Sequence, residues 1–173
     1  METQQLIELV QGSPKDGGVL KLIVLRLPSD RRHTPSQATL SIERGVAGDR
    51  WGLKTHADPL SQISVMNSRF LEAIAGETER MSLAGDNLIV DLDLHKDNVP
   101  PGTRLRIGEA VLEVTDVPHT GCSKFERRYG KAALDLTNTA EGSALRLRGV
   151  LARVIHGGEV RLGDIVRKEP SNA

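Results

Sequence analysis

The residues most able to do chemistry lie together in the segment VPHTGCSKFERRYG, residues 117–130. This segment holds Cys122, the single cysteine of the chain, with His119 and Thr120 shortly before it. A cysteine acts as a nucleophile or a metal ligand in its thiolate form, so its function depends on whether its surroundings favour that form. A lone cysteine is more often a small buried hydrophobic side chain, and this alternative stays open here.

The residues that follow the cysteine predict the start of a helix. Ser123 and Glu126 form an S-x-x-E capping box, which predicts Ser123 as the N-cap and Cys122 as the residue just before it. The positive end of a helix dipole stabilises a thiolate, and cysteines so placed have pKa values lowered to about 3.5–7.5. The sequence therefore predicts a thiol with a lowered pKa.

The same helix carries a basic face. Lys124, Arg127 and Arg128 have i, i+3, i+4 spacing and share one side of the predicted helix, whereas Phe125 and Tyr129 share the other and can anchor it to the core. Clustered lysine and arginine side chains are suited to binding phosphate. The alternative is an ordinary solvated surface.

Other kinds of site receive less support. A zinc site needs three or four ligands, and HTGC (119–122) offers two at most. The glycine-rich run GVAGDRWG (45–52) lacks a Walker lysine followed by Ser or Thr, so it does not predict nucleotide binding. Its glycines more simply permit a tight turn that orients Asp49 and Arg50.

Composition limits the classes of protein to which the chain can belong. The 173 residues suit one domain, and 23 basic residues balance 23 acidic ones, so no broad positive field for nucleic acid is expected. A single cysteine cannot form an internal disulfide, which favours a reducing, cytoplasmic location. No signal peptide and no membrane span are expected, because the N-terminus lacks a basic region and no apolar run reaches about 20 residues.

The elements that must position these residues are mostly short strands. Aliphatic runs bounded by turn residues predict strands within 19–27, 87–92, 103–117 and 149–166. Leu105, Ile107 and Leu112 are among the residues expected to point into the core from a hairpin that turns at Gly108-Glu109.

Few helices are expected. The segment 67–76 has Asn67 as N-cap and Gly76 as stop, and the segments 123–130 and 131–138 follow later. This pattern predicts a mostly β, α+β fold, a small barrel with a few short helices at its rim. The polar stretches 27–37 and 137–146 are expected to be loops, and the most mobile segments.

Several segments together resemble a MOSC domain, the module named after the C-terminal domain of molybdenum cofactor sulfurases. The segments that carry the resemblance are GVAGDRWG (45–52), QISVMN (62–67), AGDNLIVD (84–91), PGTRLRIGEAVLEVTDVPHTGC (101–122) and RGVLARVIHGGEVRLGDIV (148–166). The resemblance covers about residues 20–167 and implies that 1–173 form one MOSC domain with a short polar tail, 168–173.

The resemblance also implies a site. Cys122 matches the family cysteine that ligates molybdenum held by a pterin cofactor, molybdopterin, and basic residues would grip the pterin phosphate. Pyridoxal phosphate is not expected, because the aminotransferase-like domain that uses it in sulfurases is not part of the resemblance. Many members have proline before the cysteine, whereas this chain has Gly121. The expected cofactor-binding residues are Asp49, Arg50, Asn87, His119, Thr120, Lys124, Arg127 and Arg128.

Three functions remain open. In the first, Cys122 ligates molybdenum in a reductase of N-hydroxylated or other N-oxygenated compounds, and a separate reductase supplies the electrons. In the second, Cys122 carries a persulfide, received from a partner such as a cysteine desulfurase, for cofactor or metal–sulfur cluster assembly. In the third, the barrel binds an anionic ligand without catalysis. The expected partners are a small-molecule substrate or cofactor, with no nucleic acid and no membrane.

Overall fold

The computed structural model describes residues 1–170, and its centre is a closed β-barrel of seven strands. Around the barrel the strands follow the order β1 (Gly18–Ile23), β12 (Ile165–Lys168), β8 (Arg104–Ile107), β9 (Ala110–Val114), β10 (Val150–His156), β6 (Ile63–Asn67) and β7 (Leu88–Asp91). Neighbouring strands are antiparallel except β6 and β7, which are parallel. The expectation of a mostly β barrel with short helices is confirmed.

The barrel is filled by aliphatic side chains. β8 alternates exposed and buried residues, with Leu105 and Ile107 pointing inward, as expected for a strand with one core-facing side. On β9, Leu112 and Val114 are buried, and Val111 on the opposite face is buried as well, whereas Glu113 is only partly buried. The predicted hairpin between β8 and β9 is therefore confirmed.

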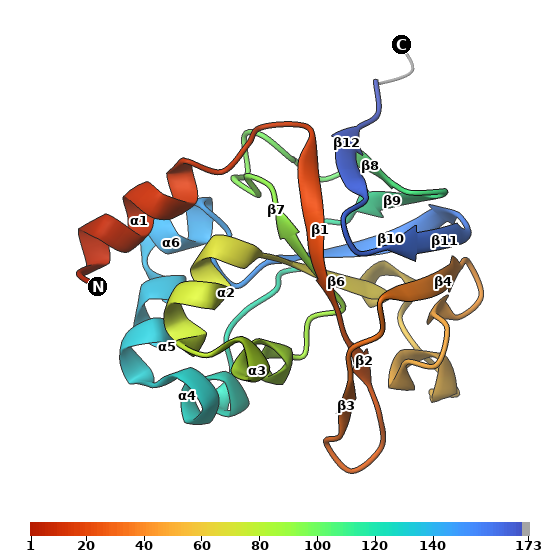
Figure 1. The fold of residues 1–173 in the computed structure, drawn as a ribbon, viewed down its shortest axis with the longest axis horizontal. Coiled ribbons are helices and arrows are strands. Elements are labelled where there is room, and N and C mark those ends of the chain that lie inside the picture. Colours follow the sequence, from red (N-terminus) through yellow and green to blue (C-terminus); the bar gives the residue numbers. More distant parts are fainter. Residues whose placement is uncertain (171–173) are drawn as a thin grey trace.

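The α-helices gather on one side of the barrel (Figure 1). They are α1 (Thr3–Gln11), α2 (Ser68–Ala75), α3 (Thr78–Met81), α4 (Ser123–Tyr129), α5 (Lys131–Asn138) and α6 (Ala140–Ala144). A second hydrophobic cluster, with Phe70 and Leu71 at its centre, lies between these helices and the barrel. Asn67 caps α2 by accepting a hydrogen bond from the Phe70 N–H at 3.0 Å, and α2 ends at Gly76, so both predicted boundaries are confirmed.

Two small sheets and three short 3₁₀ helices complete the fold. One sheet has the order β11 (Gly158–Arg161), β4 (Gln37–Ser41), β5 (Gly45–Val46), and the other pairs β2 (Leu25–Arg26) with β3 (Arg32–His33). The 3₁₀ helices are η1 (Arg50–Leu53), η2 (Pro59–Ser61) and η3 (Ser82–Ala84). Within residues 1–170, no helix is long and apolar enough to cross a bilayer.

Some expectations about the elements are wrong. The segment 27–37 is not only a loop, because β3 lies inside it, and 137–146 contains α6, which Thr139 caps through its side chain. The strand expected over 19–27 is divided into β1 and β2 at Val24. In the predicted tail 168–173, Lys168 still belongs to β12, and residues 171–173 lie outside the described part of the chain.

Candidate functional site

Cys122 lies where the loop after β9 meets α4. Its backbone is extended, with φ −129° and ψ 176°, and it is itself the N-cap of α4. The predicted capping box is therefore wrong by one position, because Ser123 already has helical geometry and is the first residue of the helix. The correction moves the thiol closer to the helix end, and the side chain is exposed to solvent.

The surroundings of Cys122 favour the thiolate. The backbone N–H of Phe125 makes the largest contribution to lowering the pKa of the Cys122 thiol, and partial burial opposes it. The backbone N–H of Lys124 and the positive charges of Arg148 and Arg128 lower the pKa further. The expected direction of the shift is confirmed, and the interpretation of Cys122 as a buried hydrophobic side chain is excluded by its exposure.

The thiol opens into a strongly cationic pocket, called the thiol pocket below. Its volume is about 150 Å³, and its walls come from β2, β3, η1, η2, β6, β10, the loop 115–122 and α4. Six of its lining residues carry positive charge: Arg26, Arg32, Arg50, Lys124, Arg128 and Arg148. Asp30 is the only acidic residue among those that line it.

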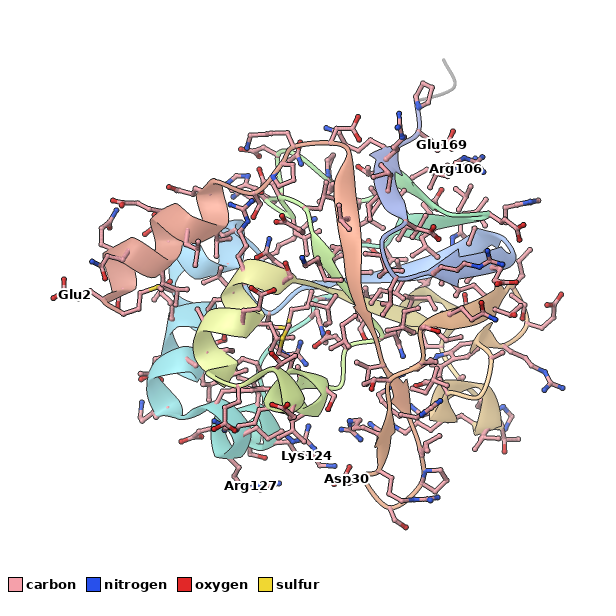
Figure 2. The ribbon with its side chains drawn as sticks, viewed as in Figure 1. Glu2, Asp30, Arg106, Lys124, Arg127 and Glu169 are labelled. Carbon is pink, nitrogen blue, oxygen red and sulfur yellow. The ribbon has the colours of Figure 1, made fainter. Side chains whose placement is uncertain are left out.

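Asp30 stands at the tip of the β2–β3 hairpin, facing three of these cations. Its Oδ1 lies 3.7 Å from Lys124 Nζ and 3.9 Å from both Arg50 Nη1 and Arg128 Nη2. Lys124 and Asp30 lie next to each other in Figure 2, whereas Arg127 projects outward. Two of the three residues predicted to form a basic face therefore line the pocket, and Arg127 does not.

A fully buried carboxylate organises the rear wall of the thiol pocket. Asp86 accepts a hydrogen bond from Arg148 Nη1 at 2.6 Å, and its other oxygen lies 2.8 Å from Nε2 of His119. Burial alone would raise the pKa of Asp86, but the charges of Arg148 and His119 hold it below its ordinary value. Arg148 also stacks over the Phe125 ring at 5.1 Å, and its buried Nε has no hydrogen-bond partner among the described residues.

Asp49 and Asn87 have structural roles instead of lining the thiol pocket. Asp49 accepts hydrogen bonds from Nε and Nη2 of Arg26, from the Trp51 N–H and from Asn87 Nδ2. The Asn87 amide also bonds to Val24 and accepts from the Ser64 N–H. Both side chains are buried, so they hold Arg26 and β6 in place, and Arg50 is the residue of the GDR motif that lines the pocket.

A second chamber lies on the other side of the loop 115–122. Its volume is about 270 Å³, and Thr120 lines it without lining the thiol pocket. His119, Arg148 and Leu151 line both cavities and form the wall between them. The predicted residues His119 and Thr120 are therefore near the site, but they belong partly to this second chamber.

Sequence reasoning missed four of the charged residues that line the thiol pocket: Arg26, Asp30, Arg32 and Arg148. Arg26, Asp30 and Arg32 belong to segments read as strand or loop, Arg148 lies between two such segments, and no local spacing marks any of them. Within residues 1–170, no group of three or more His, Cys, Asp or Glu side chains is arranged to hold a metal ion. A metal at this site would therefore have to be bound by Cys122 together with ligands that enter the site with the metal.

Comparison with known proteins finds one family model that matches the chain and several solved structures with a similar fold. The family model of the MOSC domain matches residues 52–167 of this chain. No curated protein matches the chain. Among solved structures, YuaD from Bacillus subtilis has a TM-score of 0.60 at 17% identity, with 87% of this chain and 93% of that one covered. YiiM from Escherichia coli has a TM-score of 0.57 at 23% identity, with 90% and 71% covered. A crystal structure of a hypothetical protein has a TM-score of 0.60 at 23% identity, with 89% and 68% covered.

Proposed function

Since this chain belongs to the MOSC domain family, we propose that it binds a pterin-type molybdenum cofactor with the Cys122 thiolate as the protein's ligand to the metal. The observation that carries the proposal is an exposed cysteine of lowered pKa in a cationic pocket. Thiolate is a soft ligand that suits a metal already held by the two sulfurs of a pterin dithiolene. The cations would bind the phosphate that such a cofactor carries.

The residues present fit this cofactor in charge and in donor chemistry. Arg50, Lys124 and Arg128 converge on one carboxylate oxygen, so they would hold a phosphate oxygen in the same way. The Nε of Arg148 is a buried donor that needs an acceptor, and a bound group in the thiol pocket would supply one. Asp86 keeps Arg148 in place without neutralising the rest of the pocket.

The proposed reaction is the reduction of an N-hydroxylated or other N-oxygenated compound. The cofactor, when bound, would supply the redox chemistry for removing an oxygen atom from the substrate. The reaction consumes two electrons and two protons and releases water, and a separate reductase would deliver the electrons. His119, held by Asp86 through Nε2, lines the thiol pocket and would be the side chain placed to relay a proton to the substrate.

The experiment compares Cys122→Ser and Cys122→Ala with the wild type, all expressed in a host that makes the cofactor. Molybdenum and pterin per protein should fall strongly in both variants, while the thermal unfolding temperature stays close to that of the wild type. Ser123→Ala is the matched control, because Ser123 is the exposed neighbour and does not line the pocket. Equal molybdenum content in the wild type and both cysteine variants would refute the proposal.

The exposure of Cys122 favours a second candidate, a sulfur carrier. Its thiolate would attack the outer sulfur of a persulfide on a donor such as a cysteine desulfurase, forming a Cys122 persulfide and releasing the donor cysteine as a thiolate. Intact-mass analysis after incubation with a desulfurase and cysteine should then show a gain of one sulfur, absent in Cys122→Ala. If no sulfur adduct forms and anion binding does not depend on Cys122, the sulfur-carrier function is refuted. The remaining function is then a barrel that binds an anion without catalysis.

A further inference from the structure

We propose that the second chamber is a binding site for a small molecule bearing one carboxylate, and that Arg146 is the residue that grips it. The chamber lies between the loop 115–122 and the segment 137–151, and its volume of about 270 Å³ suits a small organic acid. Arg146 lines it from the end of α6. Neither the family comparison nor the proposed cofactor site assigns a role to this residue.

The backbone at Arg146 is the first argument. The Leu147 N–H donates to the Gly142 carbonyl at 3.0 Å, and the Arg146 N–H donates to the Ser143 carbonyl at 3.2 Å. This pair of bonds is a Schellman motif, in which the residue at the position of Arg146 adopts the left-handed conformation and is usually glycine. Arg146 has φ +51° there. An arginine with this backbone is less favourable than glycine for the helix end, and a binding role of its side chain would offset that cost.

The charge of Arg146 is the second argument. Its Nη1 donates to the Val99 carbonyl, and no carboxylate lies within 4 Å of its guanidinium among residues 1–170. Burial lowers the pKa of Arg146, and no neighbouring charge shifts that pKa. A half-buried cation without a counter-ion is unfavourable, and an anionic ligand in the chamber would supply the missing partner.

The chamber walls select the class of ligand. Arg148 is already neutralised by Asp86, so Arg146 is the one arginine on these walls without a carboxylate partner. Asp116 also lines the chamber and repels any anion, a dianion about twice as strongly as a monoanion. A monocarboxylate therefore fits better than a phosphate, which suits the thiol pocket instead. The apolar side chains of Val150 and Leu151 would contact the body of the ligand.

The position of the chamber relates the ligand to the thiol. His119, Arg148 and Leu151 separate the two cavities, so a molecule held by Arg146 would point its far end toward the wall behind which Cys122 lies. The wall separates such a molecule from Cys122, so the carboxylate site does not depend on the proposed function.

The test uses the full-length protein with benzoate as the probe and benzamide as its neutral counterpart. Titrations followed by ¹H–¹⁵N NMR should show benzoate shifting the amides of Gly142, Ser143 and Gly149, with benzamide binding at least about tenfold more weakly. Arg146→Gly should weaken benzoate binding by at least about tenfold while keeping or raising the unfolding temperature, because glycine suits the left-handed position.

Two further variants separate the outcomes. Arg167→Gln removes an exposed positive charge that lines neither cavity, and it should bind benzoate like the wild type. Cys122→Ala should also bind benzoate normally, so loss of the cofactor and loss of the carboxylate site are measured independently. Equal affinity for benzoate and benzamide, unchanged binding in Arg146→Gly, or shifts that map away from the chamber would overturn the inference.

Discussion

Asp30 occupies the place where an anion would bind, so its removal should strengthen anion binding. Ser29 and Asp30 both have positive φ, +61° and +56°, at the tip of the β2–β3 hairpin. Asparagine tolerates this left-handed conformation better than most residues, so Asp30→Asn should remove the charge and preserve the turn. In this variant, Arg50, Lys124 and Arg128 should no longer have an acidic side chain at the hairpin tip as their counter-ion.

The size of the effect follows from the geometry. Asp30 has three cations at 3.7–3.9 Å, and its side chain is 54% exposed. Exposed pairs of this kind are worth about 0.2–1 kcal/mol each after solvent screening, so the three together contribute about 1–2 kcal/mol. Inorganic phosphate, which no longer has to displace this carboxylate, should bind about 5–30-fold more tightly.

Isothermal titration calorimetry with inorganic phosphate at low ionic strength measures this gain. Asp97→Asn is the control for a change of one charge unit, because Asp97 is 81% exposed and lines neither the thiol pocket nor the second chamber. The gain should be confined to Asp30→Asn and should shrink as salt is added. The same affinity in the wild type and Asp30→Asn, or an equal gain in Asp97→Asn, would refute the reasoning.

Three other predictions test the surroundings of the site. Because the pKa of Cys122 is lowered, its rate of alkylation by iodoacetamide should reach half of its maximum below about pH 8.5, and a midpoint at or above that value would contradict the helix-end argument. Asp86→Asn should reduce stability in urea unfolding by about 3–5 kcal/mol, because Arg148 would remain buried without its partner. Since the folded-state pKa of Asp86 is lowered, its contribution is present above about pH 3.9 and is lost as the pH falls below that value, and a variant as stable as the wild type would contradict this. Gly149→Ala should cost about 2–4 kcal/mol, because φ is +98° and the added Cβ would lie 2.3 Å from the Val65 carbonyl oxygen; a loss under about 1 kcal/mol would show that the strand can shift.

The part of the fold that local patterns determine could be predicted from the sequence. Alternation of apolar residues marks the hairpin of β8 and β9, and Asn67 with Gly76 marks both ends of α2. The helix α1 was not predicted, although it buries Leu6, Ile7 and Val10 and begins with a capping box, because that box pairs Glu2 with Gln5 and lacks the usual Ser or Thr. Local patterns also do not determine which strands pair, so the parallel pairing of β6 with β7 needed the structure.

The candidate site was predictable only where its residues are close in the sequence. Cys122, Lys124 and Arg128 belong to one short helix and its N-cap, and their spacing indicates that they act together. Arg26 and Asp30 reach the same pocket from a hairpin almost a hundred residues earlier, which forms a separate two-stranded sheet, and only the folded structure brings them there. The GDR motif was expected to contact the cofactor as a unit, but Asp49 turns inward to Arg26 and only Arg50 faces the pocket.

The neutral net charge of the chain conceals a separation of charge at the site. Asp49 and Asp86 are buried and each neutralises one arginine, Arg26 or Arg148, which fixes those two side chains as parts of the pocket wall. Arg50, Lys124 and Arg128 are balanced locally by Asp30, through ion pairs longer than a hydrogen bond and with an exposed carboxylate. A fixed wall with a loosely held internal anion allows the pocket to stay ordered without ligand and still to exchange that anion for another. A phosphate would therefore replace an existing contact, and its affinity should depend on Asp30 more than on the total charge of the protein.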